Sequence, residues 1–533
     1  MACMPVSHWC ACPLPTFHSK FSTHPKRTEA NLLYAHDNLW LLRIGDDLLR
    51  IAKGEVTDDS WSRQVYSVDA SHYEIPPAAV VYPIDDHDVQ QVCEYGSAKK
   101  VPITARGAGT GLLGQSLSDG GIILDFTKHI NKIIEIQDNN VMVQPGIVKG
   151  VLDMELKKKN KFLPPDPAST NYCTIGGMIA NNSSGIHCLG YGNTIDFVDE
   201  VKVVYPDGKF GFASDNKFDA HMKKLHELVM PFADIIRDGY PNVSKNSCGY
   251  RLDAVMAGSK FRPHKIFVAS EGTLGIVTSV KLRILDIPTY RCILVLGFED
   301  LLDAISEVPN ILCFSPVALE MMDHTIVSHS GKMSVTDDAR GCLLFVEFAA
   351  DNHRNTEERM ELCKQSLAGR CSVIEYASDD GSIAKIWQAR KGALNNIMKM
   401  TVGSRKPIGL IEDTVVSPNL LSDHAAGLLQ TYSENRLDYV MFGHVGDGNM
   451  HTRPVIDLDS KSEVELIEKI AANVFSKVIR SGGTITGEHG DGLARVGYIE
   501  MMYGKQITNL FSKVKRLFDP AFMMNPGKKV PVK

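Results

Sequence analysis

The spacing of apolar positions changes within the first hundred residues of the chain. Residues 31–75 carry apolar side chains at helical spacing and predict a helix followed by a loop. The apolar runs at 78–84, 101–106 and 120–126 predict short strands, and the stretch 85–100 predicts a capped helix between the first two. Short strands that alternate with helices are typical of a mixed α and β protein and exclude a repeat array or a coiled coil.

A second series of elements follows a domain boundary that we place near residues 284–290. The runs 291–298 and 341–350 predict strands, and the stretch 356–369 predicts a helix after the second of them. The stretch 462–483 predicts a long helix that ends at a glycine pair. We therefore expect a second domain of α/β character with a helical C-terminal segment.

The composition is that of a soluble globular protein with at least two domains. A chain of 533 residues exceeds the roughly 250–300 residues at which single hydrophobic cores stop growing. The net charge of −6 does not favour a nucleic-acid partner, and no apolar run is long enough to predict a transmembrane helix. The twelve cysteines include no C-x2-C pair, which excludes a zinc ribbon and a ferredoxin-type cluster motif and favours free thiols in a reducing compartment.

The first 28 residues contain no Asp or Glu, as is typical of organellar transit peptides. Prolines before Phe17 would nevertheless break an amphipathic helix there. We expect residues 1–30 to be either a targeting-like segment or a disordered or wrongly assigned start. The expected compartment is the cytoplasm, with or without peripheral membrane contact, or the mitochondrion in a eukaryote.

Three glycine-rich loops provide the first candidate chemistry. Residues 109–114 match GxGxxG, but a strand rather than a helix is predicted after them, which argues against a Rossmann dinucleotide site. Consecutive N–H groups in residues 106–111 suit a pyrophosphate instead. Small residues fill the second loop, 164–185, which allows a backbone to approach a flat ligand. The third loop, 271–276, is expected to be a turn between two strands within 264–285.

Two histidine clusters in glycine-rich surroundings provide the second candidate chemistry. His444 and His451 flank a predicted turn, and Glu488 and His489 stand in a later loop. Three imidazoles and a carboxylate suit a divalent metal ion and a base. Oxidation of a 2-hydroxy acid needs such groups, because a base takes the hydroxyl proton, a Lewis acid lowers the pKa of the hydroxyl, and an arginine holds the carboxylate.

In sequence and order, these motifs resemble the FAD-linked oxidase family, whose flavin domain is of the vanillyl-alcohol-oxidase or PCMH type. The resemblance covers about residues 70–530 and includes "PPDPAS", "TIGGMIANNSSG", "SEGTLGIVT" and a closing motif at residues 525–527. "GHVGDGNMH" and "GEHG" resemble the D-2-hydroxy-acid dehydrogenase branch, which acts on D-lactate, glycolate or D-2-hydroxyglutarate. The resemblance implies FAD, held non-covalently because the first loop offers no histidine.

The resemblance also implies the site residues. The expected metal ligands are His444, His451 and Glu488, for zinc first and otherwise manganese or iron, and His489 is the expected base. Arg390 is expected to hold the substrate carboxylate, with Lys406 as a second anion contact. The expected FAD contacts are Arg106, Gly107, Ala108, Gly109, Thr110, Gly111, Gly114, Gln115, Ser116, Pro167, Ala168, Ser169, Thr174, Gly176, Gly177, Asn181, Ser184, Gly185, Ile276 and Asn525.

The expected fold is α+β: a two-subdomain PCMH-type FAD-binding domain and an α/β substrate-binding cap domain with a helical C-terminal segment. A helical lead-in follows the N-terminal segment, and a closing segment returns to the FAD domain. The expected segments are 1–30, 31–75, 76–285, 286–515 and 516–533.

The expected activity is FAD-dependent oxidation of a D-2-hydroxy acid. The alternatives are oxidation of another alcohol and a role as the flavin subunit of a larger glycolate-oxidase-type complex. A non-catalytic electron-transfer subunit and a zinc hydrolase fit less well, because the chain has both flavin-type loops and the histidine site. The expected electron acceptor is external: a quinone, a cytochrome, an electron-transfer flavoprotein or a separate iron–sulfur subunit. The separate iron–sulfur subunit is considered because "HTRPVIDLDS" resembles a subgroup of large dehydrogenases in which an iron–sulfur domain follows a similar chain. This sequence stops at Lys533. The expected oligomeric states include a homodimer. Arg453 is expected to bind the distal carboxylate if the substrate is a diacid.

Overall fold

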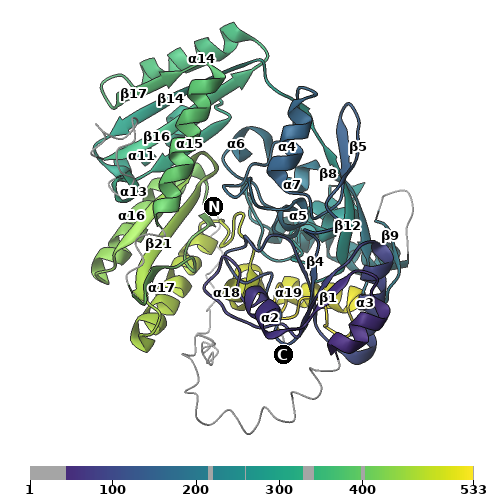
Figure 1. Cartoon of the computed structure of the whole chain (residues 1–533). Coiled ribbons are helices and arrows are strands. Elements are labelled where there is room, and N and C mark those ends of the chain that lie inside the picture. The colour runs from purple at the N-terminus through teal and green to yellow at the C-terminus, as the bar shows by residue number, and fades with distance from the viewer. Residues whose placement is uncertain (1–43, 214–219, 259, 328–340, 398–402, 532–533) are drawn as a thin grey trace.

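The computed structural model describes two lobes that meet along one face (Figure 1). It describes residues 44–213, 220–258, 260–327, 341–397 and 403–531, with the side chains of 393–397 excepted. The expected segment 1–30 and the first part of the expected lead-in helix lie outside these residues. In Figure 1 the N-terminal lobe runs from purple to teal and the cap lobe is green.

The first sheet of the N-terminal lobe confirms the predicted strands. Its order is β1-β2-β4-β3, with β2 and β3 both parallel to β4. The strands are β1 (Glu55–Thr57), β2 (Ala79–Tyr82), β3 (Ile103–Arg106) and β4 (Ile122–Asp125). The predicted helix is α3 (Asp86–Lys99), in which Asp85 caps the N-terminus and Val89 and Val92 are buried.

The lead-in differs from its prediction. Residues 44–51 are helical as expected, but β1 and the helix α2 (Ser60–Tyr66) replace the expected loop. The strand forms because β1 pairs with the edge of β2. The helix forms because the side chain of Asp59 accepts hydrogen bonds from the backbone N–H groups of Trp61 and Ser62.

The second sheet is antiparallel, in the order β5-β6-β12-β8-β9. Its strands are β5 (Ile133–Ile136), β6 (Asn140–Val143), β8 (Val198–Val204), β9 (Phe210–Phe212) and β12 (Ile276–Arg283). The expected first strand of 264–285 is wrong, because residues Pro263–Phe267 form a 3-10 helix. Proline favours a helix start, and the buried amine of Lys265 binds two carbonyl oxygens of the neighbouring segment.

The cap lobe is built on one antiparallel sheet, in the order β17-β14-β16-β15-β20-β21-β18, with β19 also paired to β21. Its strands are β14 (Tyr290–Phe298), β15 (Ala318–Met322), β16 (Cys342–Ala350), β17 (Ser372–Ala377), β18 (Arg405–Pro407), β19 (Thr414–Val415), β20 (Tyr439–His444) and β21 (Asn449–Asp457). The expected strand–helix alternation is present. The pairing nevertheless makes the cap α+β rather than α/β, because every described strand pair in it is antiparallel.

Helices accompany this sheet and lead the chain back to the N-terminal lobe. The main ones are α14 (His353–Ser366), α15 (Asp380–Ile397), α16 (Leu421–Glu434), α17 (Lys461–Arg480), α18 (Gly492–Arg495) and α19 (Ile499–Phe518). Within the N-terminal lobe, α19 packs against α8 (Ala220–Val229) and α9 (Ala233–Gly239). The side-chain amide of Asn525 then donates to the carbonyl oxygens of Gln115 and Glu271, so the closing segment ties two of the glycine-rich loops together.

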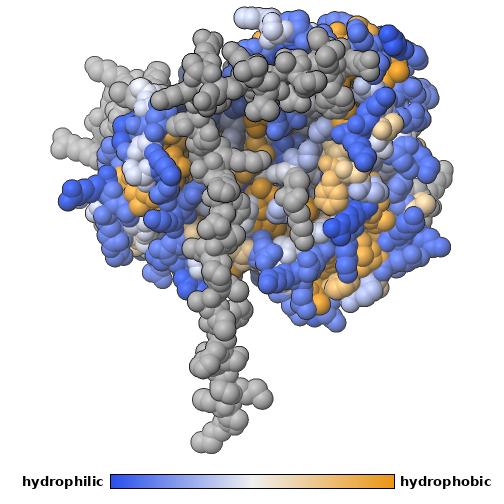
Figure 2. Space-filling model, turned by 90° about the horizontal axis from the view of Figure 1, so that it is seen from below, coloured by the Kyte–Doolittle hydropathy of each residue, from blue (hydrophilic) through white to orange (hydrophobic). Residues whose placement is uncertain are grey.

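The face shown in Figure 2 is mostly hydrophilic, with hydrophobic patches between the polar side chains. Some large apolar side chains are exposed, with Trp61 76 % and Tyr172 70 % exposed, as is normal for folded proteins. Among the described residues, no helix combines the length and the apolar content needed to cross a membrane.

A buried ion-pair group joins the two lobes at His187. Its Nδ1 lies 2.8 Å from Oδ2 of Asp166 in the N-terminal lobe, and its Nε2 lies 3.2 Å from Oε2 of Glu347 in the cap. Arg291 and Trp387 also donate to Glu347. Burial lowers the pKa of His187, but the two carboxylates outweigh burial and raise this pKa to about 10.

We expect His187→Gln to lower the melting temperature most at pH 6 and less as the pH rises toward 10. The imidazole gains protons on folding, so its ion pairs stabilise the fold fully below about pH 6.5 and lose this contribution as the pH passes about 10. Thermal unfolding at pH 6, 8 and 10 measures the difference. The exposed His353→Gln variant is the control, and a His187→Gln effect independent of pH would contradict the assignment.

Candidate active site

The candidate site forms where a hairpin of the cap sheet meets the loop before α18. β20 ends at His444, the 3-10 turn η5 (Val445–Asp447) follows, and β21 carries His451. Gly448 closes the turn with a φ of 68°, and a Cβ there would lie 1.9 Å from a neighbouring carbonyl oxygen, so only glycine fits. The predicted turn thus brings the two imidazole rings to a centroid distance of 5.1 Å.

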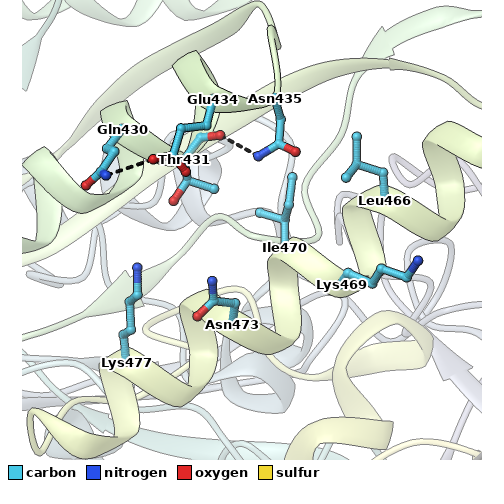
Figure 3. A pocket seen from close by; sticks show the side chains of 9 residues that line it. All are labelled: Gln430, Thr431, Glu434, Asn435, Leu466, Lys469, Ile470, Asn473 and Lys477. Atoms are coloured by element: carbon cyan, nitrogen blue, oxygen red, sulfur yellow. Dashed lines mark hydrogen bonds between the residues drawn. The ribbon is translucent and has the colours of Figure 1, made fainter.

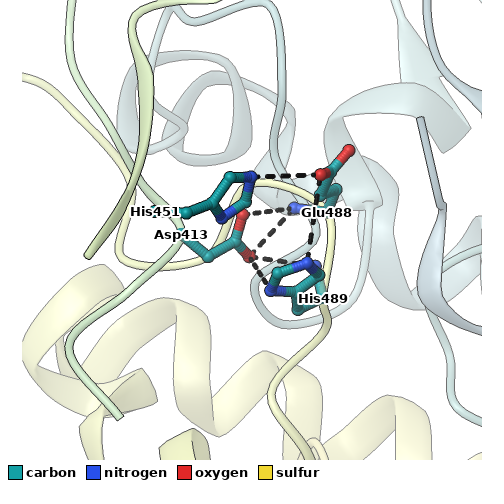
Figure 4. Close-up of side chains that lie close together, drawn as sticks. All are labelled: Asp413, His451, Glu488 and His489. Carbon is teal, nitrogen blue, oxygen red and sulfur yellow. Dashed lines mark hydrogen bonds and ion pairs between the residues drawn. The ribbon is translucent and has the colours of Figure 1, made fainter. Parts of the chain in front are cut away.

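Three imidazole rings face one oxygen of Glu488. Its Oε1 lies 2.9 Å from Nε2 of His444, 3.4 Å from Nε2 of His451 and 3.9 Å from Nε2 of His489. Figure 4 shows two of these rings and Asp413 gathered around Glu488. The side chain of His489 is 20 % exposed and that of His451 only 2 %. His489 is therefore the ring most open to a small molecule.

Two fully buried carboxylates lie on the opposite side of these rings. Nδ1 of His444 lies 2.6 Å from Oε1 of Glu320. Nδ1 of His489 lies 3.1 Å from Oε1 of Glu412, and Nδ1 of His451 lies 4.0 Å from its Oε2. Each ring therefore points Nε2 toward Glu488 and Nδ1 toward a second carboxylate. Carboxylates placed in this way orient metal-binding histidines in proteins.

The second oxygen of Glu488 is bound by the N-terminal lobe. Oε2 accepts hydrogen bonds from Oγ of Ser184 at 2.5 Å, the backbone N–H of Gly185 at 2.9 Å and Nζ of Lys245 at 3.1 Å. Lys245 is completely buried and also donates to the carbonyl oxygen of Gly185. Because Oε2 already has three donors, Oε1 is the oxygen left to face the imidazoles.

Asp413 fixes the loop that carries Glu488 and His489. Its Oδ2 accepts from the backbone N–H groups of Glu488 at 3.0 Å and His489 at 2.9 Å, and lies 3.3 Å from Nη1 of Arg495. A donor atom of Asp413 also lies within 4.8 Å of those of three site residues. Since its carboxylate is taken up by these donors, we regard Asp413 as an anchor. The imidazole of His444 is the better third donor to a metal.

Burial and neighbouring charges give the three rings different pKa values. Burial lowers the pKa of His451 to about 4. Burial also acts on His444, but its carboxylate neighbours, Glu320 first, outweigh it and raise this pKa to about 9. Burial lowers the pKa of His489 too, yet Asp413 and Glu412 leave it above its ordinary value. The site thus combines one neutral ring with two rings that carboxylates help to protonate.

The donor set fits a divalent metal ion. Two imidazole nitrogens and one carboxylate oxygen form the three-ligand set of catalytic zinc sites, which leaves a position for water or substrate. Nε2 of His444 and Nε2 of His451 lie 2.9 and 3.4 Å from Oε1 of Glu488, so the three donor atoms face one another. The structure thus brings together the three residues predicted as ligands, His444, His451 and Glu488.

Two arginines lie beside this cluster. Arg390, on α15, is buried, and its Nη2 donates to Oε2 of Glu320 at 2.7 Å. Arg453, on β21, donates from Nε to Oε2 of Glu412 at 2.8 Å. The Cζ atoms of both arginines lie near the ring of Phe442, 5.7 and 5.8 Å from its centroid. Each arginine therefore shares its carboxylate with an imidazole of the cluster.

Lys406 is not part of the cluster in this structure. It is exposed on the edge strand β18, and no ion pair of its side chain is found within the described residues. Its charge acts instead on His72, where burial first and then Lys406 lower the pKa of the imidazole.

The first glycine-rich loop fits an anion. Within the part of the chain that the structure describes, none of the backbone N–H groups of 107–111 donates a hydrogen bond. No helix follows, as predicted. Arg106 donates to the carbonyl oxygens of Tyr66 at 3.3 Å and Val68 at 2.8 Å. Its side chain therefore holds the segment that precedes the loop, while the backbone N–H groups remain available for a phosphate.

Two other predicted FAD contacts, Thr174 and Gln115, link this loop to its surroundings. A Cβ at Gly107 would lie 2.1 Å from Oγ1 of Thr174, so the first and second loops are in contact. Gln115 donates from its side chain to the carbonyl oxygen of His489, which links the first loop to the imidazole cluster. The remaining predicted residues lie at the end of the first loop, in the second loop, in the helix α5 (Ile175–Asn181) and at the start of β12: Gly114, Ser116, Pro167, Ala168, Ser169, Gly176, Gly177, Asn181 and Ile276.

Four acidic or basic residues described above lie outside the motifs identified in the sequence: Glu320, Glu412, Asp413 and Lys245. Buried Lys and Glu are rare unless they are paired. A charged residue inside an apolar run is therefore a sequence signal for such a buried, paired group, and Glu320 in "VALEMM" is an example.

A separate cavity of about 260 Å³ lies between α16 and α17. It is lined mainly by polar side chains, and its lining includes none of the imidazole-cluster residues (Figure 3).

Two family models match the chain. Residues 77–211 match one described as "FAD binding domain", and residues 287–529 match "FAD linked oxidases, C-terminal domain".

Curated relatives cover most of the chain. It is 31 % identical to the glycolate oxidase subunit GlcD of Bacillus subtilis, over 91 % of this chain and 96 % of the relative. It is 29 % identical to a D-lactate dehydrogenase of Anaerostipes hadrus, over 85 % and 89 % of the two chains. It is 30 % identical to a D-2-hydroxyglutarate dehydrogenase of Haemophilus influenzae, over 89 % of this chain but only 50 % of the relative. The chain therefore spans about half the length of that enzyme.

Solved structures share the fold. A 4-ethylphenol oxidase from Gulosibacter chungangensis superposes with a TM-score of 0.69 at 13 % identity, over 93 % of this chain and 97 % of that one. An alkyldihydroxyacetonephosphate synthase gives a TM-score of 0.64 at 16 % identity, over 91 % and 85 %.

Proposed function

Because this chain belongs to the FAD-linked oxidase family and is an FAD-dependent oxidoreductase, we propose that it oxidises a D-2-hydroxy acid to the 2-oxo acid. The observation that carries the proposal is the ring of three imidazoles around Oε1 of Glu488, linked to the first flavin-type loop through Gln115. Relatives named for glycolate, D-lactate and D-2-hydroxyglutarate, all 2-hydroxy acids, support it.

When bound, FAD would supply the oxidant, as acceptor of the hydride that leaves the substrate carbon. We propose that the backbone N–H groups of 107–111 bind the pyrophosphate of FAD, and that Asn525 of the closing segment also contacts FAD. We assign the divalent metal, zinc in the first place, to His444, His451 and Glu488. When bound there, the metal would polarise the substrate hydroxyl and lower its pKa.

His489 is the base in this proposal. It is the most exposed ring of the cluster, and its Nδ1 lies against Glu412, which leaves Nε2 directed toward the centre of the site. From there it takes the proton of the substrate hydroxyl. Arg390 binds the substrate carboxylate, because its Nε is buried without a hydrogen-bond partner among the described residues and a carboxylate would satisfy it.

A colorimetric turnover assay with an artificial electron acceptor tests the reaction. We expect turnover with D-2-hydroxyglutarate, D-lactate or glycolate, and with the D but not the L enantiomer of a chiral substrate. The physiological electron acceptor is external in this proposal. Turnover of the L-enantiomers alone would contradict the proposal.

Arg453→Ala is expected to impair oxidation of D-2-hydroxyglutarate more than that of D-lactate. The arginine lies beside the cluster and keeps Glu412 as its partner, and only the diacid has a second carboxylate for it to bind. Comparing kcat/KM for the two acids measures the difference, which we expect to be about tenfold, the equivalent of about 1.4 kcal/mol. An equal loss on both acids would assign Arg453 to the support of Glu412 alone.

A further inference from the structure

Glu320 has two partners that lie on different elements of the cap. It stands on β15 and is completely buried. Its Oε2 accepts from Nη2 of Arg390 at 2.7 Å, and its Oε1 lies 2.6 Å from Nδ1 of His444. One carboxylate thus contacts both the residue assigned to the substrate carboxylate and a residue assigned to the metal.

We propose that Glu320 is a positioning residue that holds Arg390 and His444 together in their working orientations, so that substrate binding and metal binding share one support. The proposal rests on the function proposed above, which gives Arg390 and His444 their roles. Glu320 itself is not expected to touch the substrate or the metal.

The contact with His444 fixes which nitrogen faces the metal. An ionised carboxylate only accepts hydrogen bonds, so Nδ1 of the imidazole must be the donor to Glu320. Nε2 then points toward Oε1 of Glu488, 2.9 Å away, where a metal would bind. Without Glu320, the ring could turn or present its other tautomer, and the metal would lose a fixed ligand.

The contact with Arg390 balances a buried charge. The side chain of Arg390 is 1 % exposed, and its one ion pair among the described residues is with Glu320. A buried guanidinium without a counter-charge is strongly unfavourable. Because Glu320 holds Nη2, the unpartnered Nε has a fixed direction in which it can bind a substrate carboxylate.

Glutamine cannot replace Glu320 in both contacts. A carboxylate accepts at both oxygens, whereas an amide accepts at one and donates at the other. In Glu320→Gln, either Arg390 or His444 would face the amide NH2 group, which cannot accept a hydrogen bond. The other residue would keep a hydrogen bond to the amide oxygen, but this bond would be weaker because the negative charge of the carboxylate is gone. Both contacts should therefore weaken.

Two independent assays on the FAD-loaded protein test this inference. Zinc affinity is measured without substrate, by competition with a chromophoric chelator. Affinity for pyruvate and 2-oxoglutarate is measured on metal-stripped protein, from the change they cause in the oxidised flavin spectrum. For Glu320→Gln we expect zinc affinity to fall about 10–100-fold, the usual effect of losing such a support. We expect the 2-oxo acids to bind about tenfold more weakly, as one charge-assisted contact implies.

Glu347→Gln is the matched control. Glu347 is also a buried carboxylate shared between a histidine and an arginine, but its partners are His187 and Arg291, outside the imidazole cluster. Its replacement should change neither affinity.

A loss in only one assay, or in neither, would overturn the inference while the wild type still oxidised D-2-hydroxy acids. A wild type that oxidises none of them would instead overturn the proposed function and the role of Arg390 with it. If Glu320→Gln does not retain FAD, Glu320→Asp serves in its place. It keeps the charge but is one methylene shorter and cannot reach both partners, so both losses are again expected.

Discussion

Replacing His489 by asparagine is expected to slow flavin reduction by about 10²–10⁴-fold, the usual contribution of a general base. The variant removes the Nε2 atom that lies 3.9 Å from Glu488 and leaves the backbone contacts of residue 489 with Asp413 and Gln115 in place. The loop should therefore keep its position, and both FAD and metal should stay bound. Stopped-flow flavin reduction under anaerobic conditions measures the rate.

The control for this variant is His424→Asn. His424 is a cap histidine that contacts Thr414 and lies outside the imidazole cluster. It should retain the wild-type rate of flavin reduction. A His489→Asn enzyme that reduces its flavin within threefold of the wild-type rate would show that another group takes the proton.

Replacing His451 by alanine is expected to lower zinc affinity by more than about 100-fold. This loss exceeds the one expected when a residue that only supports a metal ligand is replaced. This ring is the most suitable ligand to remove. Burial keeps it neutral, with a pKa of about 4, and its Nδ1 makes no hydrogen bond among the described residues. The fold should therefore lose little beyond packing, while the metal loses one of three ligands. Chelator competition and metal analysis of the purified protein measure the effect.

His264→Ala provides the comparison for this second prediction. His264 is a buried histidine of the N-terminal lobe, and burial likewise lowers its pKa to about 4. Its loss should leave zinc affinity unchanged. If His451→Ala bound zinc as tightly as His264→Ala, the ligand assignment of the hairpin would be wrong.

Local sequence predicted the parts of the site that depend on short-range geometry. The hairpin between His444 and His451 followed from the glycines around the turn, because the left-handed backbone of Gly448 is a local requirement. The absence of a helix after residues 109–114 followed in the same way from the strand pattern behind the loop. The expected strand at 264–268 failed because Pro263 and the tertiary contacts of Lys265 outweigh the apolar pattern.

The supports of the site could not be predicted from spacing. Glu320 is 124 positions from His444, so their contact exists only once β15 and β20 have paired in the cap sheet. Ser184 is 304 positions from Glu488, and their contact forms only once the two lobes have packed together. Ser184 and Gly185 were predicted as flavin contacts from the family pattern, and the structure shows in addition that they hold the second oxygen of Glu488. The flavin-type loop and the metal-type site are thus joined directly.

We propose, in short, that this chain oxidises a D-2-hydroxy acid with FAD as the hydride acceptor and with a metal held by the imidazole cluster. The most direct test is the visible flavin spectrum of the purified protein, recorded anaerobically with single enantiomers, with and without a chelator. We predict bleaching by a D-2-hydroxy acid, no bleaching by its L-enantiomer, and loss of bleaching with the chelator. A bound flavin that no D-2-hydroxy acid bleaches, in the presence of metal, would contradict the claim.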